Sequence, residues 1–409
     1  MDKKRLIFLA VFVVMAIILG YALYRVFFAK KAAPPLLAPP ITTKVPSRGD
    51  QFPEAPVGGR PTAGVTRPGL PQAAVAPGQA SVTPPTGAPV RLIDNAVVGV
   101  AANRQGGVQF YNGQDGRFYR IGADGRAELM SDEVFYNVQK VNWSPTNKET
   151  ILEYPDGSNI YYNFETKKQV TLPQHWQDFS FAPQGEQIEA KSIGFSPENR
   201  WLIAANPDGS EVKTIEPLGN NADRVIVDWS PNKQIIALSR TGDGISVDRQ
   251  LVLPIGTNGE NFRGITVEGR GLQTEWSPEG KKLLYSVYSG RNDFKPELWI
   301  DNAEPDTLGT GRKLLNVNTW ADKCAFADER FVYCGVPEKL RTGAGFAPQT
   351  ADQTPDRLYK IDIQTGAKTE ISLPDSETHV INTITIAPDG KYLYFTDKTR
   401  QGVFRVPKP

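Results

Sequence analysis

The sequence predicts an all-β fold, a seven-bladed β-propeller, and three observations support this prediction. First, an apolar strand ending in Trp or Phe, followed by Ser or Ala and then Pro, recurs along residues 91–409. Second, each copy is followed by short strands rich in β-branched and aromatic residues, and no window shows a helical period. Third, the copies start at positions 143, 181, 229, 276, 326 and 386. Repeats of about 40–50 residues with four short strands each are typical of propeller blades.

The repeat residues are predicted to be structural. We expect the aromatic side chain to pack between neighbouring blades, where truncation of a tryptophan typically costs ~3–5 kcal/mol. We expect the proline to shape the turn that follows the innermost strand. The residues in these roles are Trp143, Phe181, Trp229, Trp276 and Pro388.

Seven blades follow from counting strands at both ends of the repeat region. The last blade, which starts near residue 381, has only three strands, whereas the segment VRLID (90–94) precedes a complete first set. This spare strand would complete the last blade and so remove the exposed sheet edges of an open array. The blades are predicted to start near residues 97, 138, 178, 225, 272, 323 and 381. Six blades is the alternative if the first set is irregular.

Residues 1–31 are predicted to form a transmembrane signal anchor. Residues 6–24 carry no charge, and at ~1.5 Å per residue they span about 28 Å, close to the ~30 Å hydrocarbon core. This apolar run is longer than that of a signal peptide and lacks a clear cleavage site; a cleaved signal peptide is the alternative. The short amino-terminal tail favours a cytoplasmic amino terminus and an extracytoplasmic propeller at the cell membrane.

Residues 32–90 are predicted to be a disordered, Pro-rich linker. They contain 14 of the 33 prolines and a single aromatic residue, Phe52. Such a segment cannot bury enough apolar area to offset chain entropy. Its simplest role is a spacer, and the alternative is a docking strip for a partner that recognises proline.

The near-neutral net charge is an average of unlike parts. The chain has 46 Lys and Arg against 45 Asp and Glu, a net charge of +1. Residues 1–31 contribute +5 and residues 32–90 contribute +2, so residues 91–409 carry −6 (36 basic against 42 acidic). A mildly acidic folded part argues against a nucleic-acid partner.

The repeat phrases resemble the WD40-like PD40 repeat of TolB-type propellers. The best matches are residues 276–282, WSPEGKK, and residues 387–391, APDGK. The resemblance covers about 91–409 and implies the propeller fold, but propellers host many unrelated activities. The chain differs from TolB because an anchor and linker stand in place of a separate α/β domain. It differs from propeller-containing peptidases because it has no Gly-x-Ser-x-Gly nucleophile elbow.

Cys324 and Cys334 are the two cysteines of the chain. If Asp328 to Arg330 form the turn between their strands, the two cysteines lie directly opposite each other, at a spacing that a disulfide can bridge. An extracytoplasmic location permits oxidation. A disulfide, two buried thiols and a reactive redox pair are the three alternatives.

No catalytic, cofactor-binding or metal-binding residue is assigned from the sequence. The two histidines, His175 and His379, lie in connections between blades and need not approach each other. Asp-Gly pairs occur singly, as expected of hairpin corners rather than calcium loops. We therefore expect no cofactor.

Two connections contain residues that a simple turn does not require. One is TGDGISVD (241–248). The other covers residues 337–356 between the second and third strands of its blade, and long loops in compact domains are often functional. It presents Arg341, Phe346 and Pro348 as candidate partner-binding residues, with a tolerated insertion as the alternative.

The function that this organisation favours is a noncatalytic, membrane-anchored interaction module with a protein or cell-envelope partner. The first alternative is a propeller-type enzyme, such as a lactonase, lyase or cyclase, with carboxylates or histidines converging in the central channel. The second is a ligand sensor, which is disfavoured because only residues 1–5 would lie inside the cell.

Overall fold

The computed structural model describes Met15, Leu19 and residues 87–260, 262–374 and 377–409. The rest of the predicted anchor, and the predicted linker as far as residue 86, lie outside the described residues. Within the described part of the chain, no helix combines the length and apolar character needed to cross a membrane. The anchor and the linker therefore stay predictions.

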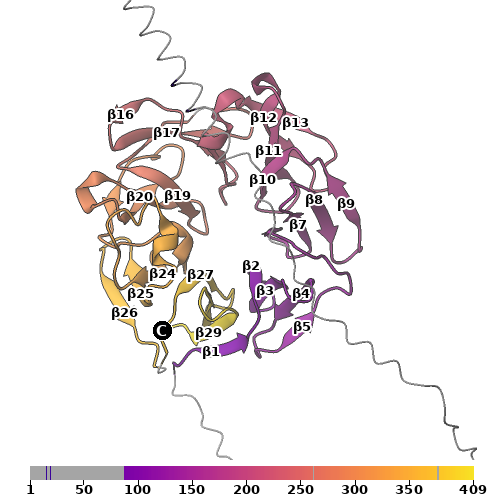
Figure 1. Ribbon diagram of the computed structural model, residues 1–409, viewed down its shortest axis with the longest axis vertical. Helices are drawn as coiled ribbons and strands as arrows, with labels where there is room; N and C mark the ends of the chain where they lie inside the picture. The colour runs from indigo at the N-terminus through magenta and orange to yellow at the C-terminus, as the bar shows by residue number, and fades with distance from the viewer. Residues whose placement is uncertain (1–14, 16–18, 20–86, 261, 375–376) are drawn as a thin grey trace, which may run out of the picture. The chain divides into compact units, whose positions relative to one another are not determined.

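Residues 87–409 form seven antiparallel sheets arranged in a ring, which confirms the seven-bladed, all-β prediction (Figure 1). Each sheet is one blade, with its first strand nearest the centre of the ring. The first three blades consist of β2 (Val97–Asn103), β3 (Gly107–Asn112), β4 (Arg117–Ile121) and β5 (Ala127–Leu129); β6 (Lys140–Trp143), β7 (Glu149–Glu153), β8 (Asn159–Asn163) and β9 (Gln169–Leu172); and β10 (Trp176–Phe181), β11 (Ile188–Ile193), β12 (Arg200–Ala205) and β13 (Lys213–Pro217).

The remaining blades continue the pattern, and only blade 4 has a fifth strand. They consist of β14 (Val225–Val227), β15 (Ile235–Ser239), β16 (Gly244–Ser246), β17 (Arg249–Gly256) and β18 (Ile265–Val267); β19 (Arg270–Trp276), β20 (Lys282–Tyr288), β21 (Pro296–Asn302) and β22 (Lys313–Leu314); β23 (Cys324–Phe326), β24 (Phe331–Pro337), β25 (Asp356–Asp362) and β26 (Lys368–Ile371); and β27 (Ile381–Ile386), β28 (Tyr392–Asp397), β29 (Val403–Pro407) and β1 (Val90–Ile93).

The predicted blade boundaries agree with the structure to within two residues. The first strands begin at residues 97, 140, 176, 225, 270, 324 and 381. The segment 241–248, interpreted as a connection, contains the additional short strand β16, which pairs with β17. Blade 4 therefore extends outward from the ring at this point (Figure 1).

The ring is closed by β1, as the strand count predicts. β1 pairs antiparallel with β29, so the fourth strand of blade 7 comes from the start of the described domain and its other three from the end. Arg91 fastens the join, since its guanidinium donates to the carbonyl oxygen of Arg400 at 2.6 Å. Gly402, with φ +89°, lets β1 approach closely, because a Cβ there would lie 1.9 Å from the Ile93 carbonyl oxygen.

In blades 4 and 5 the serine of the repeat phrase closes the turn between the first and second strands. In blade 4 the Ser230 hydroxyl accepts a hydrogen bond from the Ile235 N–H at 2.9 Å, and in blade 5 Ser277 does the same for Lys282 at 2.9 Å. Both serines, like Ser144 of blade 2, are fully buried. A buried hydroxyl with a backbone partner fixes the turn at no desolvation cost.

The repeat aromatics pack between neighbouring blades. Trp229 contacts blade 3 residues such as Leu202, and Trp276 belongs to a cluster with Ile235 of blade 4. Trp143 donates its indole N–H to the carbonyl oxygen of Gly99 in blade 1. Phe181 packs in the cluster between blades 2 and 3, whereas Pro388 is exposed in its turn.

Candidate interaction surface

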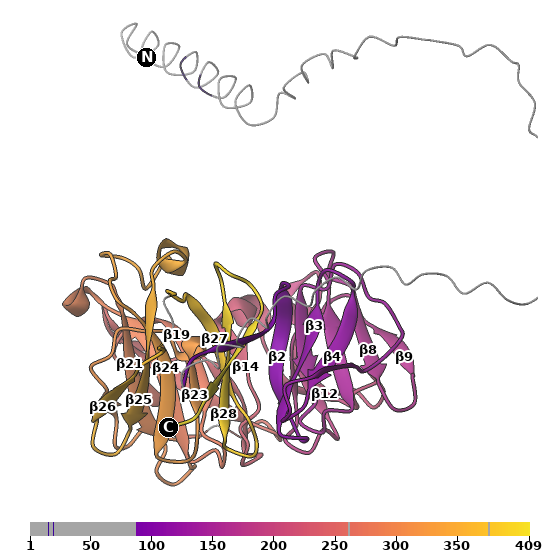
Figure 2. The same cartoon turned by 90° about the horizontal axis from the view of Figure 1, so that it is seen from below.

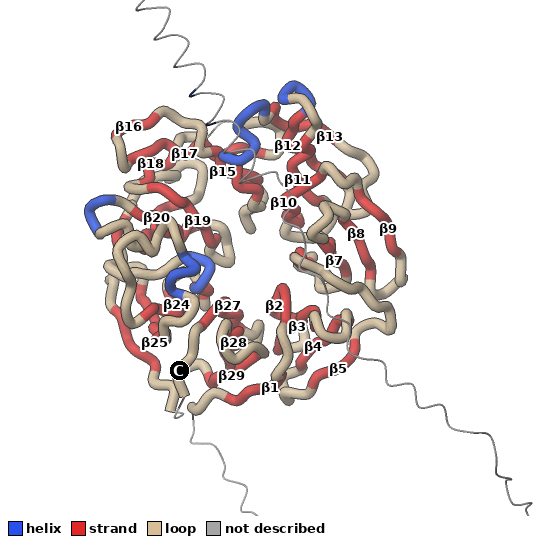
Figure 3. Tube along the Cα trace, viewed as in Figure 1, coloured by secondary structure: helices blue, strands red, loops and turns tan. Residues whose placement is uncertain are grey.

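The ring has two faces that differ in their connections. Strand direction alternates across each antiparallel blade, so connections from first to second and from third to fourth strands share one face, here called the hairpin face. Connections from second to third strands and from blade to blade share the other, here called the crossover face. Figure 2 shows the ring from the side, and Figure 3 shows its short helices. All five lie in crossover-face connections: η1 (Pro197–Asn199), η2 (Gly219–Arg224), η3 (Gly290–Asn292), η4 (Ala321–Lys323) and η5 (Pro348–Ala351).

Exposed apolar side chains are concentrated on the crossover face. Ten large apolar side chains in the described part of residues 87–409 are exposed, and seven of them lie in connections of this face. The seven are Val134, Tyr136, Phe195, Ile245, Val247, Phe294 and Phe346. The other three are Val90 and Leu129 on outer strands and Val212 on the hairpin face. Single exposed apolar residues are common, and their concentration on one face makes that face the candidate interaction surface.

Three connections of this face join into one structure, here called the ridge. The ridge consists of residues 240–248, 289–295 and 338–355, from blades 4, 5 and 6. The first two segments are linked by the Gly290 N–H, which donates to Asp248 Oδ2 at 3.1 Å. Arg270 strengthens the link, because its guanidinium donates to the carbonyl oxygen of Val247 at 2.7 Å.

The second and third segments of the ridge are joined through their backbones. The Gly343 N–H donates to the Asp293 carbonyl oxygen and the Gly345 N–H to the Phe294 carbonyl oxygen, both at 2.8 Å. Gly345 permits this approach, since a Cβ there would lie 2.3 Å from Cβ of Tyr288. The three connections are therefore fixed relative to one another.

Phe346 of the ridge is 61% exposed, yet contacts hold its ring in place. It makes edge-to-face contacts with Tyr288 (centroids 5.8 Å apart) and Phe294 (6.0 Å). Gly343, with φ +84°, lets the ring pack directly against the backbone, because a Cβ there would lie 2.7 Å from Cζ of Phe346. An aromatic ring that is already ordered loses little entropy when it binds a partner.

The long connection 338–355 is folded over a small core of its own. Trp320, Ala344 and Ala351 are buried there, with Leu340 packed against them. η5 follows, and the Glu338 N–H donates to the Pro355 carbonyl oxygen at the base of the loop. The loop therefore presents its exposed residues in a fixed geometry.

The three candidate residues of this loop differ in their positions. Arg341 and Phe346 are exposed, whereas Pro348 is half-buried and lines a small cavity with Trp320. Neither Arg341 nor the neighbouring Lys339 has an ion-pair or hydrogen-bond partner for its side chain within the described residues. The loop thus carries an exposed phenylalanine ring, Phe346, and two cationic side chains without a partner in the described residues.

Sequence reasoning missed the other apolar residues of the ridge. Ile245 and Val247 lie in the connection 241–248, and Phe294 lies in the short segment SGRNDFK (289–295). The signal that was available is an apolar side chain among Gly, Asp and Arg at a position where a turn needs only polar residues. Their proximity to Phe346 has no sequence signal, because it depends on how three blades pack.

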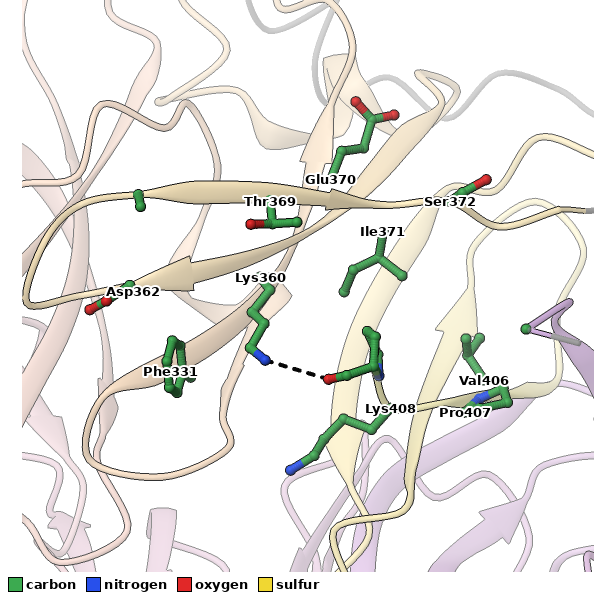
Figure 4. Close-up of a pocket in the computed structure, with 13 residues that line it drawn as sticks. Phe331, Lys360, Asp362, Thr369, Glu370, Ile371, Ser372, Val406, Pro407 and Lys408 are labelled. Atoms are coloured by element: carbon green, nitrogen blue, oxygen red, sulfur yellow. Dashed lines mark hydrogen bonds between the residues drawn. The ribbon is translucent and has the colours of Figure 1, made fainter.

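A groove of about 640 Å³ lies elsewhere, between the outer parts of blades 6 and 7 (Figure 4). Two of its charged groups are already paired: Lys360 donates to the Pro409 carbonyl oxygen at 3.4 Å and Asp362 pairs with Arg330 at 2.8 Å. Its aromatic ring, Phe331, is covered by the Lys360 ammonium, 4.8 Å from the ring centroid.

The two histidines lie on opposite sides of the ring. His175 is exposed in the connection from β9 to β10, whereas His379 is buried in the connection from β26 to β27. His379 Nδ1 lies 3.0 Å from Asp397 Oδ2, and its ring packs against Phe395 and Phe404. Among the described residues, no three His, Cys, Asp or Glu side chains are gathered so as to hold a metal ion.

Cys324 and Cys334 form a disulfide between β23 and β24, with their sulfur atoms 2.16 Å apart. They are direct cross-strand partners, and both are buried. The bond ties the innermost strand of blade 6 to its second strand. It lies within the cluster that packs blade 6 against blade 5.

Three carboxyl groups lie close together between blades 3, 4 and 5. Burial raises the pKa of Asp228, just after β14, to about 7, although contacts with Trp276 and Thr274 oppose the rise. Burial and the nearby Asp228 raise the pKa of Glu275 in β19 to about 8. The same two causes raise the pKa of Glu189 in β11, whose carboxyl oxygens have no hydrogen-bond partner in the described structure.

These carboxyl groups predict that the propeller is more stable at mildly acidic than at alkaline pH. Each is protonated more strongly in the folded than in the unfolded chain, so the stabilisation is complete below about pH 4. It is lost as the pH rises through 7 to 8. We expect the thermal midpoint to fall between pH 5.5 and 8.5 by on the order of 5 °C.

Variants test the origin of this slope. Asp228→Asn and Glu275→Gln should flatten the profile measured by calorimetry, whereas the exposed Asp306→Asn should leave it unchanged. Asp208, whose pKa Lys168 and Ser210 lower to about 2, contributes only at lower pH. A midpoint that is constant or rises over this interval would contradict the assignment.

No protein-family model matches the chain, and no curated protein matches its sequence. Similar solved structures include an oligogalacturonate lyase in complex with manganese (14% identity, 80% of this chain and 94% of that chain, TM-score 0.55). Others are the β-propeller domain of Cps50 (Swd1) from Myceliophteria thermophila (13%, 78% and 97%, 0.52) and streptogramin B lyase (10%, 78% and 96%, 0.50). At such identities the likeness shows the fold alone: the chain is a seven-bladed β-propeller, shared with lyases and with a WD40-type protein.

Proposed function

We propose that this chain is a membrane-anchored, extracytoplasmic propeller of the TolB-like type that acts as a noncatalytic docking module for a protein or cell-envelope partner. The observation that carries the proposal is that, among the described residues of 87–409, seven of ten exposed large apolar side chains lie on the crossover face. The predicted anchor at residues 6–24 and the predicted linker would hold the propeller at the membrane on a long tether.

Photo-crosslinking in cells tests this proposal. A crosslinking amino acid would replace Tyr136 or Phe195 on the crossover face, and Val212 on the hairpin face would serve as the matched control, because all three are exposed. The expected result is that both crossover positions capture the same partner and Val212 does not. Absence of a specific adduct at both crossover positions, or equal capture at Val212, would contradict the proposal.

A propeller-type lyase is the second candidate function, favoured by the neighbouring carboxyl groups of Asp228, just after the inner strand β14, and Glu275, in the inner strand β19. The full chain would be incubated with oligogalacturonate and Mn²⁺, and the unsaturated product followed by ultraviolet absorbance. Turnover that disappears in the Asp228→Asn, Glu275→Gln double variant would support this candidate over the docking module. No turnover would count against it.

A further inference from the structure

We propose that the ridge binds a protein segment in which an apolar anchor is flanked by carboxylates. This inference rests on the proposed docking function and specifies where the partner binds and what its chemistry is. The binding elements are the apolar side chains of Ile245, Val247, Phe294 and Phe346 together with the cations of Lys339 and Arg341.

The aromatic part of the ridge is contiguous across two blades, and a polar contact joins it to the hairpin of a third. Phe346 of blade 6 contacts Phe294 of blade 5, and the Asp248 carboxylate joins the blade 5 segment to the hairpin that carries Val247. Val247 is 80% exposed and Phe346 61%. Aromatic residues at the centre of such a surface are the usual binding hot spots.

The charges of the ridge select the partner. Most charges near it are internally paired, as in Lys295 with Asp293 at 3.3 Å and Lys398 with Asp352 at 2.6 Å. Lys339 and Arg341 in the blade 6 loop have no partner within the described residues, and in the blade 4 segment the exposed carboxylate of Asp243 likewise has none. Two unpaired cations beside an exposed aromatic ring fit carboxylates that flank an apolar side chain, because guanidinium groups bind carboxylates with high geometric specificity.

The fixed geometry of the loop distinguishes a binding surface from an insertion that is merely tolerated. The loop has its own buried core, and the Phe346 ring rests on Gly343. A chain that only needed to bridge β24 and β25 would gain nothing from ordering an exposed phenylalanine. The ring is thus pre-organised for a partner, which lowers the entropy cost of association.

The test uses the purified full chain in detergent and synthetic fluorescent peptides, with binding followed by anisotropy at low and high salt. The probe is an amphipathic peptide that alternates Phe or Leu with Glu. Its comparisons are the same peptide with Lys in place of Glu, and polyglutamate, which carries charge alone. We expect the acidic amphipathic probe to bind at least about tenfold more tightly than either comparison, and less tightly at high salt.

Variants of the ridge complete the test. Phe346→Ala should weaken binding of the acidic probe by about tenfold or more. Arg341→Glu with Lys339→Glu should weaken it similarly and remove its salt dependence, and both side chains are exposed, so folding is preserved. Val212→Ala, on the hairpin face, is the matched control and should bind normally, with thermal unfolding verifying each variant.

Several results would overturn the inference. These are equal binding of the acidic and basic probes, binding of polyglutamate as tight as the amphipathic probe, or unchanged binding by Phe346→Ala. Self-association that depends on Phe346 and competes with the probe would instead assign the ridge to a second copy of this chain. If crosslinking at Tyr136 and Phe195 still captures a partner while the ridge variants have no effect, the docking function stands and only its assignment to the ridge fails.

Discussion

Removal of residues 87–94 is expected to destabilise the propeller strongly. β1 forms the outer edge of blade 7, and Leu92 and Ile93 pack into the cluster that joins blades 7 and 1. Full burial of such a side chain contributes about 1.5–3 kcal/mol, and these two half-buried side chains contribute roughly half of that each. Arg91 adds hydrogen bonds to the Arg400 and Gln401 carbonyl oxygens. The expected loss is on the order of 5 kcal/mol, measured by urea unfolding of the shortened chain.

The matched control is a chain shortened to residues 87–409, which should unfold like the full chain. A synthetic peptide of residues 87–96, added to the 95–409 chain, should restore part of the lost stability by occupying the vacant edge of β29. Unchanged stability after removal of residues 87–94 would contradict the role of β1 in closing the ring.

Replacing Asp356 by alanine is expected to destabilise the propeller by about 3–5 kcal/mol, because it leaves a buried lysine without its counter-charge. Lys323 Nζ lies 2.7 Å from both carboxylate oxygens of Asp356, and the carboxylate side chain is fully buried. Asp356 Oδ2 also accepts the Ile381 N–H at 2.7 Å, so the pair joins η4 and β25 of blade 6 to β27 of blade 7.

A double-mutant cycle separates the ion pair from the packing around it. Lys323→Met combined with Asp356→Leu should recover much of the stability lost in Asp356→Ala, since apolar pairs often replace buried ion pairs without loss. Denaturant unfolding of the unmodified chain, of the single variants Lys323→Met and Asp356→Leu, and of the double variant gives the coupling energy. A double variant no more stable than Asp356→Ala would show that the Ile381 hydrogen bond, rather than the charge pair, dominates.

The repeat made the architecture predictable. Six of the seven blades carry a copy of the repeat phrase, and in blades 4 and 5 its serine, Ser230 or Ser277, closes a local turn, so the blade boundaries depend on residues near one another in sequence. The incomplete last blade then required the strand at 90–94 to close the ring.

The interaction surface was less predictable because it depends on contacts between blades. The length of their loop was enough to predict Arg341 and Phe346 as candidate binding residues. The contact of Phe346 with Tyr288 spans two blades and has no local sequence signal. The same holds for Asp228, Glu275 and Glu189, which look like ordinary strand-end carboxylates until neighbouring blades bury them.

The strand that closes the ring also sets the order of events during synthesis. Arg91 and its partner Arg400 are 309 positions apart in the chain. β1 therefore cannot pair with β29 until nearly all of the propeller has been synthesised. Contacts of such sequence separation form slowly, and unpaired strand edges invite aggregation in the interval. On the proposed export route this interval would fall outside the cytoplasm, where the strand edges of blade 7 would stay exposed until β1 pairs with β29.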